Sequence, residues 1–408
     1  MRSEWGTARL VDVAAKKRWA LNGGPFGSKL SRKHYSESGV PVIRGTNLPS
    51  GCKFSFDDFV FVTEEKADQL QANNAHPGDL VFTQRGTIGQ VGLIPRDSCF
   101  RRFVISQSQM KLTVDHTVAD ALFLYYYFSA ADTVQKIQNL AFAAGVPHIN
   151  LDILRNFEVS LPPLPIQQRI AGILSAYDEL IENSQRRIKI LESMARALYR
   201  EWFVHFRFPG HDHHPRVASP LGEIPQGWEV KKLGEVLELN YGKALKKEDR
   251  RGGDYPVFGS SGIVGTHDAA LVEGPGIIVG RKGNVGSVFW CDDDFFVIDT
   301  AYFVTASVPL RFLLYVLPTL NFINSDAAVP GLSRNQAYTL ELLVPPASLL
   351  EKFCELAGTF ERQSATLQRQ LQNLRRTRDL LLPRLLSGQV AVDTHSGAIS
   401  DSPAGPRQ

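Results

Sequence analysis

The chain has 408 residues, which is enough for two or three domains with sizeable cores. It is 43% hydrophobic and 21% charged with a net charge of +3, a balance that is ordinary for a soluble globular protein and permits a polyanionic partner without requiring one. The N-terminal stretch MRSEWGTARL lacks the apolar region of a signal peptide, and ALFLYYYF at 121–128 is too short to span a bilayer. These features argue against a membrane protein, and we expect a cytoplasmic one.

The first part of each half of the chain is predicted to form β-strands joined by tight turns. Its short apolar runs are bounded by turn residues, as in GVPVIRG at 39–45, GDLVFTQRG at 78–86 and GPGIIVGRKG at 274–283. Helical segments are expected at about 120–140 and 310–323. The globular parts are therefore predicted to be of the α+β class.

A long helix is predicted after each of these parts. The first should run from about 165 to 203 and the second from about 347 to 382, because apolar residues recur every seven positions in both. At 1.5 Å per residue each helix would be roughly 50–60 Å long. Ser184 interrupts the first helix, and Ser364 and Arg378 weaken the second. The predicted coiled-coil seam comprises Ile170, Leu174, Tyr177, Ile181, Ile188, Leu191, Leu198, Phe353, Phe360, Leu367, Leu371, Leu374 and Leu381.

Several segments of the first half recur in the second half in the same order. Trp5 aligns with Trp228 at an offset of 223 (228 − 5). The segment RGTIGQVG at 85–92 resembles RKGNVGSV at 281–288, and their glycines align at an offset of 197 (283 − 86). The sequence therefore predicts two similar units related by an internal pseudo-twofold repeat.

Pro-Pro pairs mark the start of both predicted helices. Pro162-Pro163 and Pro345-Pro346 share an offset of 183 (345 − 162), as do Pro147 and Pro330 just upstream. Proline is tolerated in a first helical turn, and it pushes the preceding residue out of helical geometry. A Pro-Pro pair therefore makes a stiff boundary between a globular part and a rod, and its repetition indicates two units of this kind.

These signals define the predicted domain boundaries. The tail is rich in Ser, Pro and Gly, which favours disorder. We expect a first globular domain at 1–162, a long helix at 163–206, a linker at 207–227, a second globular domain at 228–345, a second long helix at 346–389 and a disordered tail at 390–408.

Signatures of catalysis and metal binding are absent from the sequence. There is no Walker A motif and no Ser-His-Asp or Cys-His arrangement, and the four cysteines lie far apart without a CxxC pair. HDHH at 211–214 lies in a Pro- and Gly-rich linker without a second ligand cluster, so we interpret it as solvated. A nuclease-like set could be drawn from Asp58, Glu64 and Lys66, but short acidic runs of this kind are common on surfaces. We therefore predict no catalytic and no metal-binding residues.

Basic and polar side chains gather at the predicted turns of both halves. Arg and Lys can bind phosphates or guanine edges, and Asn or Gln can read adenine. Turns place such groups outside the scaffold, where they can meet a groove of DNA. The candidate DNA-binding residues are Lys29, Arg32, Lys33, Arg44, Thr46, Gln84, Arg85 and Thr87 in the first half, and Tyr241, Lys243, Lys246, Lys247, Ser260, Ser261, Arg281, Lys282, Asn284, Arg334 and Asn335 in the second.

Several longer motifs are specific enough to indicate a family. They are LGEIPQGWEVKKLGEV at 221–236, the GTIGQVG and GNVGSV pair, LPPLPIQQRIAGILSAYDELIENSQRRIKILESMARALYREWFVHF at 161–206 and the closing LLPRLLSG at 381–388. Over about residues 5–390 the chain resembles the specificity (S) subunit of type I restriction–modification systems. One departure is PPASLLEKF at 345–353, because this family usually has Gln after the Pro pair, as at Gln167.

The resemblance implies a fold and a role for the chain. Two mixed α/β target recognition domains, separated by two long helices that pair as an antiparallel coiled coil, would each read one part of a split target in double-stranded DNA. The S subunit itself would have no catalytic activity and no cofactor. It would recruit two methyltransferase (M) subunits, which use S-adenosylmethionine to methylate adenine N6. It would also recruit restriction (R) subunits, which depend on ATP and Mg²⁺ and cleave foreign DNA.

Three other interpretations stay open at the level of sequence. A solitary or silent S subunit would work with M subunits only, and the neighbouring genes distinguish it. A structural adaptor would use the coiled-coil rod to present two protein-binding domains, and sequence-specific DNA binding by the assembled complex separates it from an S subunit. A free-standing nuclease would use Asp58, Glu64 and Lys66, and it would cleave DNA alone with Mg²⁺ and without ATP.

Overall fold

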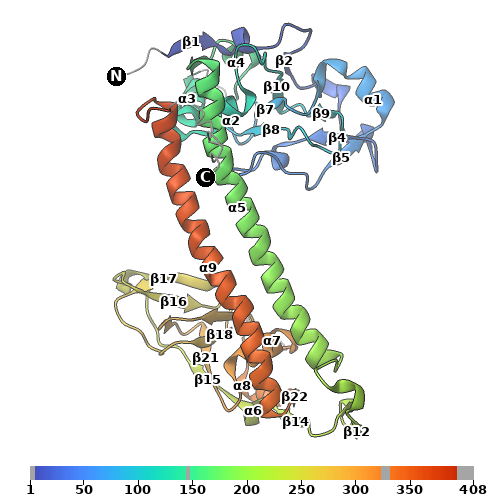
Figure 1. The fold of residues 1–408 in the computed structure, drawn as a ribbon, viewed down its shortest axis with the longest axis vertical. Helices are drawn as coiled ribbons and strands as arrows, with labels where there is room; N and C mark the ends of the chain where they lie inside the picture. Colours follow the sequence, from blue (N-terminus) through green and yellow to red (C-terminus); the bar gives the residue numbers. More distant parts are fainter. Residues whose placement is uncertain (1–4, 144–147, 323–330, 393–408) are drawn as a thin grey trace, which may run out of the picture. The chain divides into compact units, whose positions relative to one another are not determined.

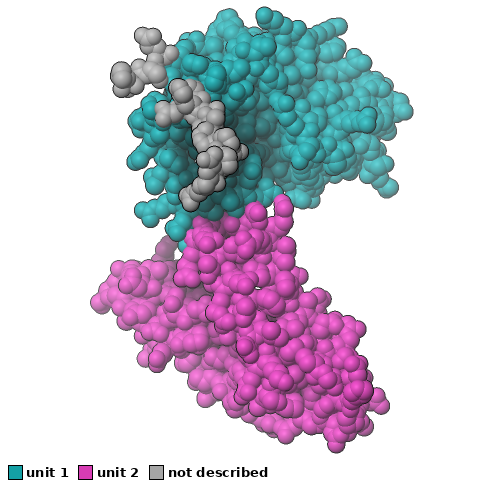
Figure 2. Space-filling model, in the orientation of Figure 1, with its two compact units in different colours: residues 1–182, 372–408 teal, residues 183–371 magenta. Residues whose placement is uncertain are grey.

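The computed structural model describes residues 5–143, 148–322 and 331–392 of the chain. The chain divides into two compact units, of which unit 1 comprises residues 1–182 and 372–408 and unit 2 comprises residues 183–371 (Figure 2). Unit 1 is therefore assembled from both ends of the chain. The aligned Pro147 and Pro330 and most of the predicted tail lie outside the described residues.

Unit 1 contains two sheets and a strand pair at its edge. The four-stranded sheet is antiparallel and has the order β2 (Leu21–Gly23), β10 (Gln109–Leu112), β7 (Leu80–Thr83) and β8 (Val91–Leu93). The five-stranded sheet has the order β3 (Tyr35–Ser36), β5 (Val60–Val62), β4 (Val40–Ile43), β9 (Phe103–Ile105) and β6 (Asn74–Ala75), with β4 and β9 parallel. The first strand, β1 (Gly6–Arg9), pairs with β11 (Glu158–Leu161).

Helices cover the four-stranded sheet of unit 1. The segment predicted as helical near 120–140 forms α2 (Ala121–Ser129) and α3 (Ala131–Ala143), which are separated at Ala130 (Figure 1). The Asp120 side chain caps α2 by accepting a hydrogen bond from the Phe123 amide at 2.8 Å. The aromatic run of α2 is buried, and Phe128 packs on Phe82 of β7 with ring centroids 4.9 Å apart. Two short helices, α1 (Glu64–Gln69) and α4 (Leu151–Arg155), complete the unit outside the long helices.

Unit 2 repeats this plan. Its four-stranded sheet has the order β15 (Leu237–Tyr241), β21 (Ala301–Ala306), β18 (Gly276–Gly280) and β19 (Val288–Cys291). Its three-stranded sheet has the order β17 (Gly262–His267), β16 (Tyr255–Gly259) and β20 (Phe296–Val297), and β14 (Glu229–Lys232) pairs with β22 (Glu341–Val344). Its short helices are α6 (Leu233–Val236), α7 (Leu310–Val316) and α8 (Arg334–Tyr338).

The two units share the strand order of their four-stranded sheets and the register of the strand pairs β1–β11 and β14–β22, whereas the second sheet has five strands in unit 1 and three in unit 2. Gly6 pairs with Leu161 in unit 1 and Glu229 pairs with Val344 in unit 2, which reproduces the offsets of 223 (229 − 6) and 183 (344 − 161). The parallel pair β4 and β9 likewise corresponds to β16 and β20. The internal repeat predicted from the sequence is therefore confirmed at the level of individual strand pairs.

Residues 207–227 fold into a β-hairpin on unit 2. Strands β12 (Arg216–Ser219) and β13 (Gly222–Pro225) pair in this segment, and Phe208 and Ile224 are buried in the core of the unit. Two histidines of HDHH contact backbone carbonyls, because His211 Nδ1 lies 2.9 Å from Phe208 O and His214 Nε2 lies 2.7 Å from Gln226 O. The interpretation of HDHH as simply solvated is therefore wrong for these two side chains.

The two predicted long helices are present, and each contributes to both units. They are α5 (Leu164–Tyr199), which continues into a π-helical turn at Arg200–Val204, and α9 (Ala347–Leu386). In unit 1, Asp178 of α5 contacts Arg378 near the end of α9 at 2.9 Å. In unit 2, Tyr199 at the end of α5 contacts Phe353 near the start of α9, with ring centroids 6.3 Å apart. The helices therefore pair in antiparallel orientation.

Every residue of the predicted seam is buried or half-buried. The buried seam residues are Ile170, Leu174, Ile181, Ile188, Phe353 and Leu367, and the half-buried ones are Tyr177, Leu191, Leu198, Phe360, Leu371, Leu374 and Leu381. The two serines that interrupt the heptads, Ser184 and Ser364, are also buried. Small polar residues therefore occupy seam positions without leaving the interface.

A half-buried carboxylate joins the helix pair to the rest of each unit. In unit 1, Asp178 accepts hydrogen bonds from Tyr126 of α2 at 2.6 Å and from Arg378 of α9 at 2.9 Å. Burial, together with the hydrogen bond to Asp178, raises the pKa of Tyr126 above its usual value, so the phenol stays protonated. We call this triad and its counterpart in unit 2 the carboxylate joints. The departure from the heptad pattern at Arg378 is explained by this contact.

The carboxylate joint of unit 2 uses equivalent positions. Glu361 of α9 lies 183 residues after Asp178 (361 − 178), and it accepts a hydrogen bond from Tyr315 of α7 at 2.7 Å. Arg311, also on α7, pairs with Glu361 at 2.5 Å. The tyrosine and the carboxylate are thus repeated, whereas the arginine comes from a different helix.

The two helix starts differ at the position where the second copy departs from the family pattern. Gln167 is 1% exposed, its Nε2 donates to Pro162 O at 2.8 Å, and its Oε1 accepts from the Asp120 amide at 2.9 Å. The equivalent residue in the second helix is Leu350, which is 3% exposed and packs in the core of unit 2. One boundary is therefore held by a buried amide and the other by apolar contact.

Replacing Asp178 tests the carboxylate joint. The D178N variant removes a charge that pairs with Arg378, whose side chain is 19% exposed, as is that of Asp178. We expect unit 1 to lose about 2 kcal/mol of stability, since breaking a largely buried pair leaves one charge poorly compensated. Hydrogen exchange of the α2 and α9 amides measures this local stability.

Asp379 provides the matched control, because it also pairs with Arg378, at 2.8 Å, but is 63% exposed. The D379N variant should change stability by less than about 0.5 kcal/mol. Equal losses in the two variants would contradict a special role for Asp178.

Candidate nucleic-acid interface

A tight turn joins the last two strands of each four-stranded sheet. It covers residues 84–90 between β7 and β8 in unit 1, and residues 281–287 between β18 and β19 in unit 2. These turns carry Gln84, Arg85 and Thr87 in one unit and Arg281, Lys282 and Asn284 in the other. Six of the predicted DNA-binding residues therefore lie on one repeated structure.

Equivalent backbone hydrogen bonds hold both turns. The Gln84 amide donates to Ser108 O at 2.7 Å, and the Arg281 amide donates to Thr300 O at 2.9 Å. Gln84 O accepts from the Ile149 amide at 3.2 Å, and Arg281 O accepts from the Leu332 amide at 2.7 Å. Both turns are therefore held by equivalent main-chain contacts.

The next residue in each turn forms an isolated bridge to a second segment. Arg85 bridges to His148 in unit 1, and Lys282 bridges to Gly331 in unit 2. Both side chains are exposed. Arg85 and Lys282 therefore occupy equivalent positions and point a cation at solvent.

Glycine is required at one position of each turn. Gly89 has φ +96° and a Cβ placed there would lie 2.7 Å from a Val134 methyl group. Gly286 has φ +76° and would meet the Phe322 ring at the same distance. Any larger residue would be strained and would clash, which explains why the GxxG spacing was visible in the sequence as a repeat.

The other candidates of unit 1 lie in short loops. Thr46 is exposed in a 3₁₀ turn (Gly45–Asn47), and a Cβ on its neighbour Gly45 would lie 3.6 Å from Gln90 Oε1. Arg44 is half-buried and its guanidinium donates to the carbonyl of Asp58. Part of the hydrogen-bonding capacity of the Arg44 guanidinium is thus used within unit 1. Lys29, Arg32 and Lys33 are exposed in two further 3₁₀ turns, Gly27–Lys29 and Arg32–His34.

Three candidates of unit 2 form a stacked cluster. The Tyr241 ring is 50% exposed, and the guanidinium carbons of Arg281 and Arg334 lie 4.8 and 4.7 Å from its centroid. Arg281 Nη1 donates to Asp299 O at 3.0 Å, and Arg334 Nη1 donates to Leu239 O at 3.0 Å. Cation–π contacts and these backbone anchors hold two positive charges in fixed positions on the surface.

A second group of candidates lies beside this turn. Asn284 Nδ2 donates to Ser261 Oγ at 3.1 Å, and the Ser260 amide lies 3.4 Å from Thr300 Oγ1. Ser261 and Asn284 are exposed, and Lys282 Nζ lies 3.9 Å from the exposed Asp299 carboxylate. The hairpin tip between β16 and β17 and the turn between β18 and β19 are thus brought together.

The remaining candidates of unit 2 are exposed but are not joined to the stack by a described side-chain contact. Lys243 follows β15 and its amide donates to Val297 O at 2.9 Å. Lys246 and Lys247 lie at a 3₁₀ turn (Lys247–Asp249), and Asn335 lies in α8. These four residues extend the polar surface beyond the cluster.

Sequence reasoning missed two residues at or near these candidates. Tyr302, which is 1% exposed, lies beneath Tyr241 with ring centroids 5.1 Å apart, and its hydroxyl donates to Leu332 O at 3.1 Å. Burial first, and then hydrogen bonding with Tyr241, raises the pKa of Tyr302. Phe26, in the loop after β2, is 86% exposed. GGPFG at 23–27 does signal a turn, but no sequence signal gives the exposure of its phenylalanine.

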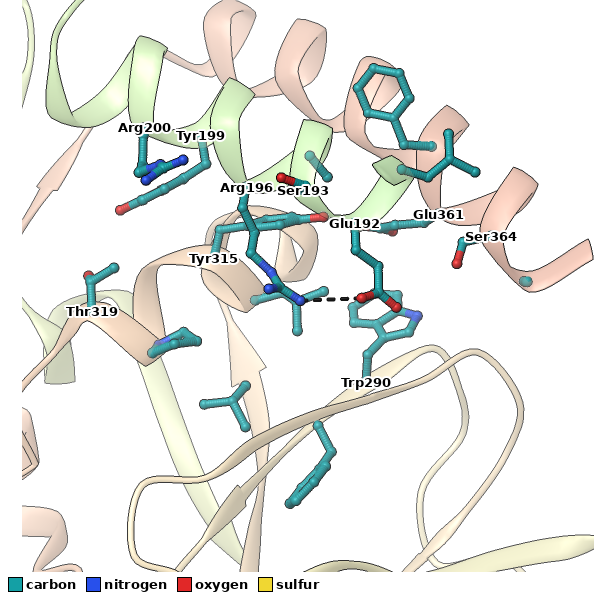
Figure 3. A pocket seen from close by; sticks show the side chains of 18 of the residues that line it. Glu192, Ser193, Arg196, Tyr199, Arg200, Trp290, Tyr315, Thr319, Glu361 and Ser364 are labelled. Atoms are coloured by element: carbon teal, nitrogen blue, oxygen red, sulfur yellow. Dashed lines mark hydrogen bonds and ion pairs between the residues drawn. The ribbon is translucent and has the colours of Figure 1, made fainter. Parts of the chain in front are cut away.

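A cleft lies apart from these residues in unit 2. It has a volume of about 1350 Å³ and is lined by residues of α5, α7, α9 and β19, and no candidate DNA-binding residue lines it. Figure 3 shows Arg196 and Glu192 of α5, which pair at 3.5 Å, and Trp290 of β19 across the cleft. Leu191 and Phe360 border the cleft, which explains why these seam residues are only half-buried.

The described parts of the chain contain neither a metal-binding cluster nor a helix that could cross a membrane. Within residues 5–143, 148–322 and 331–392, no group of three or more His, Cys, Asp or Glu side chains is placed to hold a metal ion. The four cysteines are free thiols. None of the helices described there combines the length and apolar character that crossing a bilayer requires.

Comparison with known proteins gives one family. The type I restriction modification DNA specificity domain matches residues 2–193 and 225–342, which together cover more than half of the chain. The MjaIX specificity subunit of Methanocaldococcus jannaschii is 24% identical, with 81% of this chain and 82% of the relative covered. The EcoprrI specificity subunit of Escherichia coli is also 24% identical, with 85% of this chain and 88% of the relative covered.

A solved structure agrees with the fold. The crystal structure of the type I restriction–modification S subunit from M. genitalium matches with a TM-score of 0.66 over 94% of this chain and 96% of that one, at 19% identity. This chain thus shares the fold of that protein. This chain belongs to the type I restriction modification DNA specificity family.

Proposed function

We propose that this chain is the sequence-reading subunit of a type I restriction–modification complex and that each unit reads one half of a bipartite target in double-stranded DNA. The observation that carries the proposal is the repeated turn, which presents Arg85 in unit 1 and Lys282 in unit 2 at equivalent exposed positions. Exposed cations bind phosphates, and neighbouring amide and hydroxyl groups reach base edges.

The stacked cluster supports a DNA contact in unit 2. Arg281 and Arg334 are anchored through backbone carbonyls and stacked on Tyr241, so their charges are fixed before DNA arrives. Pre-positioned guanidinium groups lose less conformational entropy on binding than free ones do.

Catalysis is assigned to partner subunits in this proposal. Two methyltransferase (M) subunits would use S-adenosylmethionine to methylate adenine N6, and restriction (R) subunits would supply the activity that depends on ATP and Mg²⁺. The repeated units give one chain two similar surfaces, which suits two copies of one partner. A chain with a net charge of +3 also has little excess charge for holding DNA alone, so we expect tight binding only in the assembly.

Methylome sequencing tests this function directly. Cells that carry this gene and an M subunit gene should show a split adenine-methylated motif that disappears when this gene is deleted. If no such motif is found although both proteins are present and associated, the proposal is wrong. The chain would then be better explained as a structural adaptor.

Alanine at the two equivalent turn positions should separate the half-sites. We expect R85A to weaken binding of the assembled complex about tenfold through one half-site, and K282A to do the same through the other, since each removes one exposed cation from one unit. Binding to duplexes that carry one intact and one scrambled half-site measures this.

Cations elsewhere in each unit serve as controls. Arg155 pairs with Asp152 in unit 1 and Lys231 pairs with Glu229 in unit 2. Their alanine variants should leave both half-sites unchanged. If R85A and K282A each reduced both half-sites equally, the assignment of one half-site to each unit would fail.

Insertion of one heptad into both α5 and α9 tests the antiparallel pair as a spacer. Seven residues add roughly 10 Å of helix, which corresponds to about three base pairs of B-DNA. The methylated motif should keep both half-sites and gain about three undefined positions between them. Inserting the seven residues in only one helix should instead disrupt assembly, because the seam would lose its register. A spacer of unchanged length in the double insertion would refute the idea of a ruler.

A further inference from the structure

Phe26 is the most exposed large apolar side chain among the described residues, at 86%. It lies in the loop that follows β2 and precedes the 3₁₀ turn Gly27–Lys29. The ring therefore stands free at a loop tip, where a partner could cover it and remove its apolar surface from water.

The loop that carries Phe26 is firmly held. Pro25 and Leu30 on either side of it are buried, and the Gly24 amide donates to Gln109 O at 2.8 Å. Gln107 Nε2 donates to Leu30 O at 2.8 Å and also to the carbonyl of Gly27. The ring is therefore displayed by a fixed loop rather than by a loose one.

The same segment of chain positions both this loop and the candidate interface of unit 1. Gln107 holds the Phe26 loop, and the next residue, Ser108, accepts the hydrogen bond of the Gln84 amide at 2.7 Å. The loop and the turn that carries Arg85 are thus neighbours.

Positive charge surrounds the exposed ring in sequence. Lys29, Arg32 and Lys33 are exposed, and none of the ion pairs found in the described part of the chain involves them. An exposed ring followed within seven residues by three exposed cations matches a polyanion whose bases offer apolar faces. It matches an ordinary protein surface less well.

We propose that Phe26 contacts the bases of the half-site read by unit 1, with Lys29, Arg32 and Lys33 binding the adjoining phosphates. This inference rests on the proposed function and adds a base-contacting residue to it. A phenylalanine can act on DNA bases in two ways, by inserting against a base step or by packing on the methyl group of thymine.

Unit 2 lacks an equivalent ring, so the effect should be confined to one half-site. Gly24 and Gly242 occupy equivalent places, because the Gly24 amide bonds Gln109 O in β10 and the Gly242 amide bonds Ala301 O in β21. Two residues after Gly24 is Phe26, and two residues after Gly242 is Ala244, so Phe26 corresponds to Ala244.

The test compares F26A, F26L and K29A in the full-length chain assembled with its M subunit. Binding to a duplex that carries the methylated motif is measured as a function of salt concentration. F26A should weaken binding through the unit 1 half-site by about tenfold while leaving the slope of log K against log salt unchanged, since no phosphate contact is lost. F26L should retain most of the affinity, and K29A should reduce the slope by about 0.9.

Two modified duplexes identify the contact. A loss of affinity when uracil replaces thymine in the half-site indicates packing on the methyl group. A rise in 2-aminopurine fluorescence on binding, absent with F26A, indicates insertion at a base step. Either result supports a base contact. L140A removes a side chain that is 43% exposed on α3 and should change nothing.

Three results would overturn the inference while leaving the proposed function intact. F26A could bind and methylate as the wild type does, or it could lose the M subunit during purification, which would make the loop a protein interface. It could also weaken both half-sites equally. Failure of the wild-type complex to methylate any split motif would instead count against the proposed function itself.

Discussion

The antiparallel pairing of α5 with α9 is the constraint on which both units depend. Each unit takes part of its core from one end of each helix, so Ile170 and Leu385 lie in the core of unit 1 while Phe353 and Trp202 lie in that of unit 2. The carboxylate joints add a specific polar contact in each unit, at Asp178 and at Glu361. A seam made only of leucine would permit several registers, whereas the half-buried Asp178 of α5, which must meet Arg378 of α9, favours one.

The duplication conserves backbone contacts more than side chains. The turn between the last two strands of each four-stranded sheet is fixed by the same main-chain hydrogen bonds in both units, yet Gln84 is replaced by Arg281 and Arg85 by Lys282. Similarly, Gly23 at the end of β2 is replaced by Tyr241 at the end of β15, where it stacks with two arginines. Because the contacts that the two units share here are made by the main chain, the side chains at these positions can differ while the backbone keeps its shape. Under the proposed function, this freedom is what lets one scaffold read two different half-sites.

Periodic and repeated signals predicted much of the architecture. The heptads gave both long helices, and the glycine pairs and Pro-Pro pairs gave the repeat, since these features depend on neighbours in sequence. The candidate site was predicted less completely. The cluster of Tyr241, Arg281 and Arg334 joins three segments that are far apart in the chain, and only tertiary structure brings them together. Burial of Ser364 and the pairing of Arg378 also contradict the simple expectation that polar residues weaken a seam, because each finds a place or a partner that periodicity cannot show.

The assembly of unit 1 from both ends of the chain has a consequence for biosynthesis. Asp178 and its partner Arg378 are separated by 200 residues. At about 5–20 residues per second, the ribosome needs roughly 10–40 s to make the intervening chain. During that interval the whole of unit 2 emerges, while the apolar face of α5 that belongs to unit 1 has no α9 to cover it. Unit 2 can therefore fold first. Unit 1, although its synthesis begins earlier, is completed only when the last turns of α9 have been made.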